Sequence, residues 1–217
     1  MIRMLISVII PVLNQEKFIG RCLRSILQQT LDRNFYEILV INDGSTDKTS
    51  YALELFGKEI TVINNKKNIG LPASVNKGIK KSKGKYIIRL DSDDYVNENF
   101  LNILFVYITS NQADAVSCDY LVVDDNENVI KKENCLRKPI GCGILFQKAH
   151  LENIGLYDNK FLYQEDKELR LRFEKKYKIS RLNLPLYRYR MHTSNMTKNK
   201  NKMKDYQKKL LIKHKSN

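Results

Sequence analysis

The first half of the chain alternates short apolar runs with segments of helical periodicity, and this alternation limits the fold more than any other feature. The apolar runs are short and rich in β-branched side chains, which is typical of buried strands. They cover residues 5–10, 36–41, 60–63 and 86–90. Apolar residues recur at helical spacing in residues 18–27 and 71–80. Strands that alternate with amphipathic helices predict an α/β fold, with a mostly parallel sheet and helices on both faces.

The pattern is looser beyond residue 94. We expect a helix over residues 98–110, a strand over 113–120, a hairpin at the turn 124–128, an apolar stretch over 141–146, and helices over 147–153 and 166–177. In the last of these helices, Asp166 shares a face with Leu169 and Phe173. This spacing predicts that the Asp166 carboxylate points toward the core side.

The size and charge of the chain predict one globular domain with a basic extension. With 217 residues and 42% hydrophobic content, the chain can bury a real core. We expect a domain over residues 1–197 and a basic C-terminal tail over 198–217. The net charge of +14 favours anionic partners. We expect the lysine-rich tail to be solvated, and the alternative is an amphipathic helix around residues 210–212 that lies on a membrane surface and reaches a lipid-linked glycan.

No apolar run approaches the roughly 18 residues that a membrane-spanning helix needs, and the N-terminus does not resemble a secretory signal. The expected location is therefore the cytoplasm, with the inner face of the plasma membrane as an extension of that expectation. The cysteines are scattered without a CxxC pair, which predicts reduced, buried thiols. They are Cys22, Cys118, Cys135 and Cys142.

Polar residues follow three of the expected strands. Ligands of such sheets bind beyond the carboxyl ends of the strands, so these positions are candidates for a site. Asn14 follows the first strand, Asp43 follows the second, and residues 91–94 (Asp-Ser-Asp-Asp) follow the strand that ends at Leu90.

Carboxylates dominate the chemistry that these positions offer. Asp91 and Asp93 are two residues apart at a strand end, where they suit a hard divalent cation shared with phosphate oxygens. Asp43 can accept hydrogen bonds from a base or a ribose. Glu165 and Asp166 open a helix, where acids are favoured by the helix dipole, and Asp166 in a partly dry cleft can act as a general base.

These segments together resemble the family 2 glycosyltransferases with the GT-A fold, a Rossmann-like α/β architecture. The resemblance runs from about residue 7 to about residue 197. It rests on six ordered motifs: residues 8–14 (VIIPVLN), 40–47 (VINDGSTD), 68–71 (NIGL), 84–94 (GKYIIRLDSDD), 165–169 (EDKEL) and 189–192 (YRMH).

The resemblance implies an inverting transfer of sugar from a nucleoside diphosphate, usually UDP, to an acceptor hydroxyl. Asp166 is then the catalytic base. The donor nucleotide contacts are Pro11, Leu13, Asn14, Asp43, Asp91 and Ser92. Asp93 and Asp91 hold Mn²⁺ or Mg²⁺, and His192 is a further candidate ligand. Gly141, Cys142, Gly143 and Glu165 lie beside the donor sugar or the acceptor.

The resemblance also implies a wider setting. The nearest analogy is bacterial surface polysaccharide, lipopolysaccharide or glycan synthesis, with a glycan or lipid-linked acceptor. Lysines and Arg190 are further candidates for contacts to the leaving group. Many members of the family continue beyond the segment that corresponds to His192, and this difference leaves the acceptor open.

Other classes of protein fit the sequence less well. A sugar nucleotidyltransferase and a dinucleotide oxidoreductase both need a glycine-rich loop after the first strand, where this chain has residues 11–14 (PVLN). A dehalogenase-type phosphatase also has a DxD, but it does not explain Asp43 or Asp166. The non-enzyme alternative is a basic nucleic-acid-binding module with stacking tyrosines. Acidic strand ends would repel a phosphate backbone, so we expect no nucleic-acid partner.

Overall fold

The computed structural model describes residues 4–193, 195 and 198–215. The strands are β1 (Ile6–Val12), β2 (Tyr36–Asn42), β3 (Thr61–Asn64), β4 (Tyr86–Arg89), β5 (Tyr95–Val96), β6 (Ala115–Val123), β7 (Val129–Glu133), β8 (Ile144–Gln147) and β9 (Ile179–Arg190). The helices are α1 (Ile19–Leu27), α2 (Thr49–Glu54), α3 (Leu71–Lys81), α4 (Phe100–Ser110), α5 (Lys148–Asn153), α6 (Glu165–Glu174) and α7 (Lys200–Lys215), with 3₁₀ turns η1 (Arg33–Phe35) and η2 (Gly57–Glu59).

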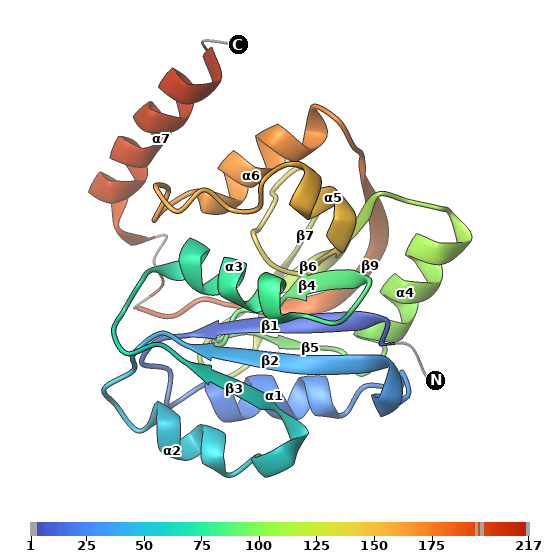
Figure 1. Ribbon diagram of the computed structural model, residues 1–217, viewed down its shortest axis with the longest axis vertical. Coiled ribbons are helices and arrows are strands. Elements are labelled where there is room, and N and C mark those ends of the chain that lie inside the picture. Colours follow the sequence, from blue (N-terminus) through green and yellow to red (C-terminus); the bar gives the residue numbers. More distant parts are fainter. Residues whose placement is uncertain (1–3, 194, 196–197, 216–217) are drawn as a thin grey trace.

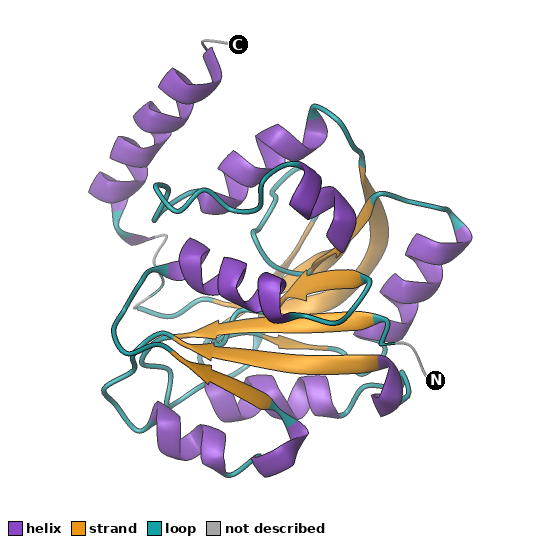
Figure 2. Ribbon diagram, viewed as in Figure 1, coloured by secondary structure: helices purple, strands orange, loops and turns teal. Residues whose placement is uncertain are grey.

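The strands form one sheet in the order β3-β2-β1-β4-β8-β6-β9-β5, with β7 paired to β6. The pairs β3–β2, β2–β1 and β1–β4 are parallel, which confirms the expected α/β fold. Beyond β4 the sheet is mixed, because β8 is antiparallel to both β4 and β6 while β9 runs parallel to β6. The carboxyl ends of β1, β2 and β4 therefore meet at one edge of the sheet (Figure 2).

Helices cover both faces of the sheet (Figure 1). Every residue of β1 is buried, as expected for a central strand that packs on both sides. Alternate side chains of β1 enter different cores: Val8 and Ile10 pack in the cluster that includes residues of α1 and α4, whereas Ile9 packs with residues of α3, α5 and α6. The period of two along the strand thus divides the apolar core between the two faces.

The sequence patterns did not identify β9 as a strand. This strand carries Pro185 and several arginines, and its exposure is irregular along its length. Its register with β6 also shifts around Asp119. Neither an alternating pattern nor a continuous apolar run marks it, although it pairs with both β6 and β5.

The C-terminal segment differs from the expected solvated tail. Residues 200–215 form helix α7, with Leu210 buried. Met203, Tyr206 and Leu210 recur at helical spacing within the lysine-rich sequence, and this stripe provides a packing surface. The expected boundary after residue 197 falls at Thr197, which lies outside the described residues.

None of the helices in the described part of the chain has the length and apolar character that crossing a bilayer requires.

Candidate active site

Asp43 lies directly after β2, and its carboxylate anchors the loop that leads to α3. Oδ1 accepts hydrogen bonds from Asn65 Nδ2 at 2.8 Å and from the Ile69 N–H at 2.9 Å, and Oδ2 accepts one from the Gly70 N–H at 3.0 Å. Asp43 is buried. The expected nucleotide-binding carboxylate is therefore held rigidly by the motif at residues 68–71.

Asn14 joins the β1 loop to the β2 loop. It has a left-handed backbone with φ of 53°, a conformation that asparagine tolerates better than most residues. Its Oδ1 accepts a hydrogen bond from the Thr46 N–H at 2.8 Å, and its own N–H donates to Ser45 Oγ at 3.0 Å. Pro11 is buried within β1, and the neighbouring Leu13 is exposed beside this joined pair of loops.

Arg89 connects the end of β4 to the start of α6. Its Nε lies 2.6 Å from Asp91 Oδ1, and its Nη1 lies 2.9 Å from Glu165 Oε1. Arg89 and Glu165 are both 8% exposed in their side chains, whereas Asp91 is 25% exposed. The two acidic motifs at residues 91–94 and 165–166, which are far apart in sequence, are therefore joined by one buried guanidinium.

Burial determines the protonation behaviour of this bridge. It raises the pKa of Glu165 to about 7; Arg89 opposes the rise and the neighbouring Asp166 adds to it. Burial also raises the pKa of Asp91, where Arg89 again opposes the rise and the Asp93 charge adds to it. The site holds acidic side chains whose charged forms are stabilised mainly by Arg89.

Asp166 is only partly buried, and its side chain makes no hydrogen bond or ion pair with the residues that the structure describes. It lines a small hollow together with Gly141 and Leu169. A Cβ added to Gly141 would lie 2.7 Å from the Asp166 Cβ and 3.3 Å from Arg89 Nη1. The residue expected as the base is thus next to the Arg89 bridge, with its carboxylate available.

In the Gly141-Cys142-Gly143 turn, neighbouring side chains leave no room for a Cβ at either glycine. Gly141 faces Asp166, and Gly143 has a φ of 69° with the Tyr187 ring 2.9 Å from where a Cβ would lie. The Gly143 N–H donates to the Arg89 carbonyl at 3.0 Å. Larger side chains here would displace either the start of α6 or strand β9.

Asp93 and His192 lie together although 99 residues separate them. His192 Nε2 is 2.8 Å from Asp93 Oδ2, and the imidazole packs on Phe18 with ring centroids 4.9 Å apart. The buried Arg190 holds the same loop, because its Nε donates to the Asp93 carbonyl at 3.0 Å and its Nη2 to Glu127 Oε1 at 3.0 Å. Arg190 therefore supports the loop internally, which argues against the expected contact to the leaving group.

Asp94, the last acid of the motif, is a structural anchor for β9. Its Oδ2 accepts a hydrogen bond from the Tyr187 hydroxyl at 2.7 Å, and its Oδ1 accepts one from the Arg190 N–H at 2.7 Å. Burial raises the pKa of Asp94 well above its usual value, and Asp93 and Asp91 add to the rise. Ser92 is also buried.

Two overlapping groups could hold a cation. Ligand atoms of Asp91, Asp94 and Cys142 lie within 4.8 Å of one another, whereas the sequence predicted Asp91, Asp93 and His192. Both Asp94 oxygens already accept hydrogen bonds, and Cys142 is a buried thiol whose pKa burial raises well above its usual value. Hard divalent cations prefer oxygen ligands, so the partly exposed carboxylate of Asp93 fits such an ion better than Asp94 or Cys142 does. Asp91 is also partly exposed, but both of its oxygens accept hydrogen bonds from Arg89.

The sequence analysis assigned no role to Arg89 or Tyr187, and it included Asp94 in the acidic motif without its anchoring role for β9. Arg89 did carry a signal, because it is a charged residue within the buried strand that ends at the acidic motif. Buried arginines are rarely unpaired, so an acidic partner could have been expected. Tyr187 carried no such signal, since it lies in the strand that the pattern did not identify.

Open α/β sheets bind their ligands beyond the carboxyl ends of the strands, and the acidic residues of this chain lie at that edge. The model of the glycosyl transferase family 2 matches residues 7–178 of the chain. This match covers most of the 217 residues, and the chain belongs to that family.

Proteins with similar sequences are named as glycosyltransferases. The chain is 30% identical over 169 residues to glycosyltransferase GlyA of Streptococcus pneumoniae, which is 76% of this chain and 23% of that protein. It is 29% identical over an alignment of 223 residues to the uncharacterized glycosyltransferase EpsJ of Bacillus subtilis, which is 89% of this chain and 63% of that protein. A poly(ribitol-phosphate) beta-glucosyltransferase of Bacillus spizizenii is 39% identical over 115 residues, 51% of this chain and 18% of that protein. The chain thus spans less than two thirds of each of these relatives.

Solved structures share the fold. S. aureus TarS in complex with UDP-GlcNAc has a TM-score of 0.82 at 21% identity, covering 96% of this chain and 66% of that one. The mannosyltransferase PcManGT from Pyrobaculum calidifontis, in complex with GDP-Man and Mn²⁺, has a TM-score of 0.79 at 16% identity, covering 99% of this chain and 65% of that one. The chain has the GT-A type of glycosyltransferase fold.

Proposed function

We propose that the chain is the catalytic domain of an inverting, metal-dependent glycosyltransferase that moves a sugar from a UDP-sugar to an acceptor hydroxyl. One observation carries this proposal: Arg89 joins Asp91 to Glu165 at 2.6 Å and 2.9 Å, which brings the neighbouring Asp166 to the same edge of the sheet. A donor carbon between these two acidic segments would have phosphate-side groups on one side and a base on the other.

In the proposed reaction, the side chains of this chain divide the work. Asp166 accepts the proton of the acceptor hydroxyl as that oxygen attacks the anomeric carbon. The bond from this carbon to the diphosphate oxygen breaks, and the nucleoside diphosphate leaves with the electron pair. Asp43 and Asn14 hold the nucleotide, while Arg89 keeps Asp91 and Glu165 in position.

The proposed metal ligands are Asp93 and Asp91, with His192 beside Asp93. His192 Nε2 and Asp93 Oδ2 lie 2.8 Å apart in a hydrogen bond, and the two atoms are close enough to bind one cation in place of that bond. Carboxylate and imidazole ligands both suit Mn²⁺, and carboxylates suit Mg²⁺. Such an ion would neutralise the charge of the departing diphosphate.

The proposals for the donor and for the biological setting rest on similar proteins. UDP-GlcNAc is bound by TarS and GDP-Man with Mn²⁺ by PcManGT, so UDP is the first nucleotide to test and GDP the second. The name of the Bacillus spizizenii relative supports a surface polymer or another bacterial glycan, free or lipid-linked, as the acceptor.

We further propose a cytoplasmic location, at the inner face of the membrane. All four cysteines are free and buried, which fits a reducing compartment. Helix α7 directs lysines and the exposed Leu211 and Ile212 outward, a composition that suits an anionic lipid surface.

Thermal shift tests the proposed class of ligand. UDP with Mn²⁺ should raise the Tm by more than UDP or Mn²⁺ alone, because a shared ion couples the two binding events. Single-stranded DNA should leave the Tm unchanged at physiological salt. Stabilisation by DNA and not by UDP with Mn²⁺ would instead favour a basic nucleic-acid-binding module. A panel of UDP- and GDP-sugars, assayed for metal-dependent hydrolysis, then identifies the donor.

A further inference from the structure

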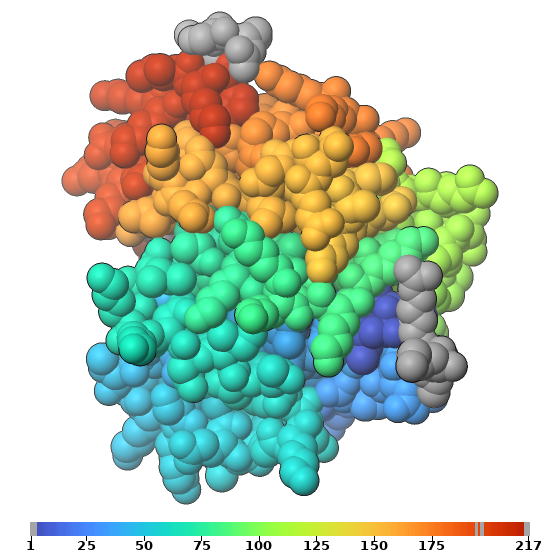
Figure 3. Space-filling view, viewed as in Figure 1, coloured from blue at the N-terminus to red at the C-terminus, as the bar shows by residue number. Residues whose placement is uncertain are grey.

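Helix α7 packs on the segment that leads into α6, the helix that carries Glu165 and Asp166. The Tyr206 ring lies 6.1 Å from the Phe161 ring and 5.5 Å from the Tyr163 ring, and Leu210 is buried. Figure 3 shows the last helix against the segment around residues 155–175 on the outside of the molecule. The lysine-rich helix therefore has a defined packing face.

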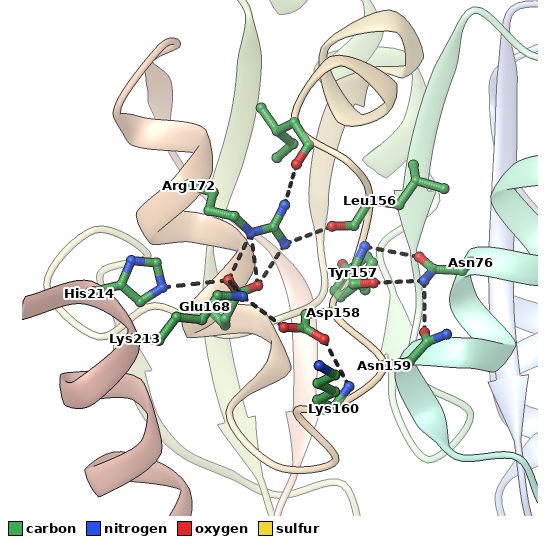
Figure 4. A network of polar contacts seen from close by, with 11 residues as sticks. Asn76, Leu156, Tyr157, Asp158, Asn159, Lys160, Glu168, Arg172, Lys213 and His214 are labelled. Carbon is green, nitrogen blue, oxygen red and sulfur yellow. Dashed lines mark hydrogen bonds and ion pairs between the residues drawn. The ribbon is translucent and has the colours of Figure 1, made fainter. Parts of the chain in front are cut away.

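A lysine of α7 supplies charge to the buried middle of α6. Lys213 Nζ lies 2.7 Å from Glu168 Oε1 and 2.7 Å from Asp158 Oδ2 (Figure 4). The Glu168 side chain is 0% exposed and also pairs with Arg172 at 2.6 Å. Burial alone would raise the pKa of Glu168, but Arg172 and Lys213 hold it below its usual value.

A second contact reaches the beginning of α6. Gln164 is the residue before the helix and has a left-handed backbone with φ of 57°. Its side chain is buried, and Nε2 donates a hydrogen bond to the Met203 carbonyl of α7 at 2.6 Å. Helix α7 thus contacts α6 on both sides of Glu165 and Asp166, at residue 164 and at residue 168.

The other side of the same segment is fixed to α3. Asn76 Nδ2 donates to the Tyr157 carbonyl at 2.8 Å, and the Tyr157 N–H donates to Asn76 Oδ1 at 2.9 Å. Arg172 of α6 holds the same segment, because its Nη2 donates to the Leu156 carbonyl at 2.6 Å. As Figure 4 shows, the segment before α6 lies between α3 and α7, with polar contacts on each side.

We propose that α7 is a brace for α6, in which Lys213 and Gln164 are positioning residues that fix the first turn of α6 against the Arg89 bridge. This inference rests on the proposed function, because it assigns the brace to the helix that carries the proposed base. Neither residue contacts the nucleotide loops at Asn14 and Asp43. Loosening the brace should therefore affect transfer and leave donor binding largely unchanged.

The experiment compares Lys213→Ala with Lys208→Ala in the full chain. Both remove one positive charge from α7, but Lys208 is exposed and makes no hydrogen bond or ion pair with the described residues. Hydrogen exchange of residues 165–169 should be about tenfold faster in Lys213→Ala and unchanged in Lys208→Ala. The kcat of transfer should fall roughly 10- to 100-fold in Lys213→Ala, as expected when a catalytic group is displaced.

A comparison of kcat with the donor KM separates a loss of positioning from a general loss of stability. In Lys213→Ala the donor KM should stay within about twofold of the wild-type value. A displaced base lowers the stabilisation of the transition state and leaves the binding of the donor in the ground state unchanged. Lys213→Arg should restore both the exchange protection and the kcat, since it keeps the charge.

Two outcomes would overturn the brace: equal exchange of residues 165–169 in Lys213→Ala and Lys208→Ala, or equal kcat values in those variants. Failure of the proposed function is distinguishable, because the wild-type chain would then turn over no sugar nucleotide. In that case the exchange comparison alone decides whether the brace exists.

Discussion

At the scale of single residues, the site separates two neighbouring acids by their surroundings. Glu165 is buried and paired with Arg89 at 2.9 Å, whereas Asp166 is partly exposed and makes no polar contact with the described residues. A carboxylate that is free of internal partners can accept a proton, and one that is paired with a guanidinium is better suited to fixing geometry. These surroundings are consistent with the proposal that Asp166 transfers the proton and that Glu165 holds the start of α6 against Arg89.

Asp93 is the residue on which metal binding should depend. Asp93→Ala removes the carboxylate beside His192 and should weaken Mn²⁺-dependent UDP binding by at least about tenfold. Isothermal titration with UDP in the presence and absence of Mn²⁺ measures this effect. Asp125→Ala, at an exposed loop position, is the control. An unchanged Mn²⁺ dependence in Asp93→Ala would move the metal to the group formed by Asp91, Asp94 and Cys142.

Glu165 should leave a signature in the pH dependence of stability. Its pKa is raised from 4.5 to about 7 in the folded chain, so between these values the folded state binds more protons than the unfolded state. This contribution to stability is fully present below the unfolded pKa and is lost as the pH rises through about 7. Glu165→Gln should therefore gain in Tm relative to the wild type, by a few degrees, between pH 5 and pH 8. Parallel Tm curves for the two proteins across this range would contradict the raised pKa.

At the scale of elements, the sequence predicts the parts of the fold whose pattern is local. The parallel strands β1, β2 and β4 are mostly apolar, and the polar residues that follow them mark the edge of the sheet at which the site lies. Strand β9 was missed because its residues are held by pairing with β6 and β5 and not by their own periodicity. The packing of α7 was missed for a related reason, since Lys213 faces a buried carboxylate on another helix.

For the candidate site, the sequence predicts a set of residues but not the contacts between them. Asp43, Asp91 and Asp93 follow strands, Asp166 opens helix α6, and the family resemblance places all four in one candidate site. The Arg89 bridge and the Asp94 anchor depend on contacts across 76 and 96 residues of sequence, which no local pattern encodes.

The turn at Gly141 should be sensitive to a single methyl group. In Gly141→Ala the new Cβ would lie 2.7 Å from the Asp166 Cβ, so the start of α6 must shift. We expect transfer to fall by about tenfold or more, with UDP binding nearly unchanged. Gly20→Ala is the matched control, because its Cβ would meet only the end of the flexible Arg24 side chain at 3.3 Å. Full transfer activity in Gly141→Ala would show that the first turn of α6 does not position the base.

At the scale of the whole molecule, the charge of +14 is compatible with an acidic site because the two lie in different places. The acids gather at the strand ends, and lysines are concentrated on α7. The outer surface of α7 presents Leu211 and Ile212, which are 46% and 71% exposed. Such a surface predicts salt-dependent binding to anionic membranes.

Vesicle sedimentation measures this binding. The wild-type chain should sediment with phosphatidylglycerol vesicles and not with phosphatidylcholine vesicles, and high salt should release it. Lys200→Ala combined with Lys204→Ala, both at exposed positions of α7, should weaken the binding by roughly tenfold. Lys58→Ala combined with Lys66→Ala removes the same charge from exposed positions elsewhere and should have a smaller effect. Equal losses in the two double variants would indicate that net charge, and not α7, drives the attraction.

In the proposed reaction, Asp166 at the start of α6 is the base, and the donor is held at the carboxyl ends of β1, β2 and β4. The most direct test is Asp166→Asn, assayed for sugar transfer and for Mn²⁺-dependent UDP binding, with Asp205→Asn on exposed α7 as the control. We predict that Asp166→Asn loses transfer by about 100- to 10,000-fold and binds UDP as tightly as the wild type. Undiminished transfer by Asp166→Asn would contradict the assignment.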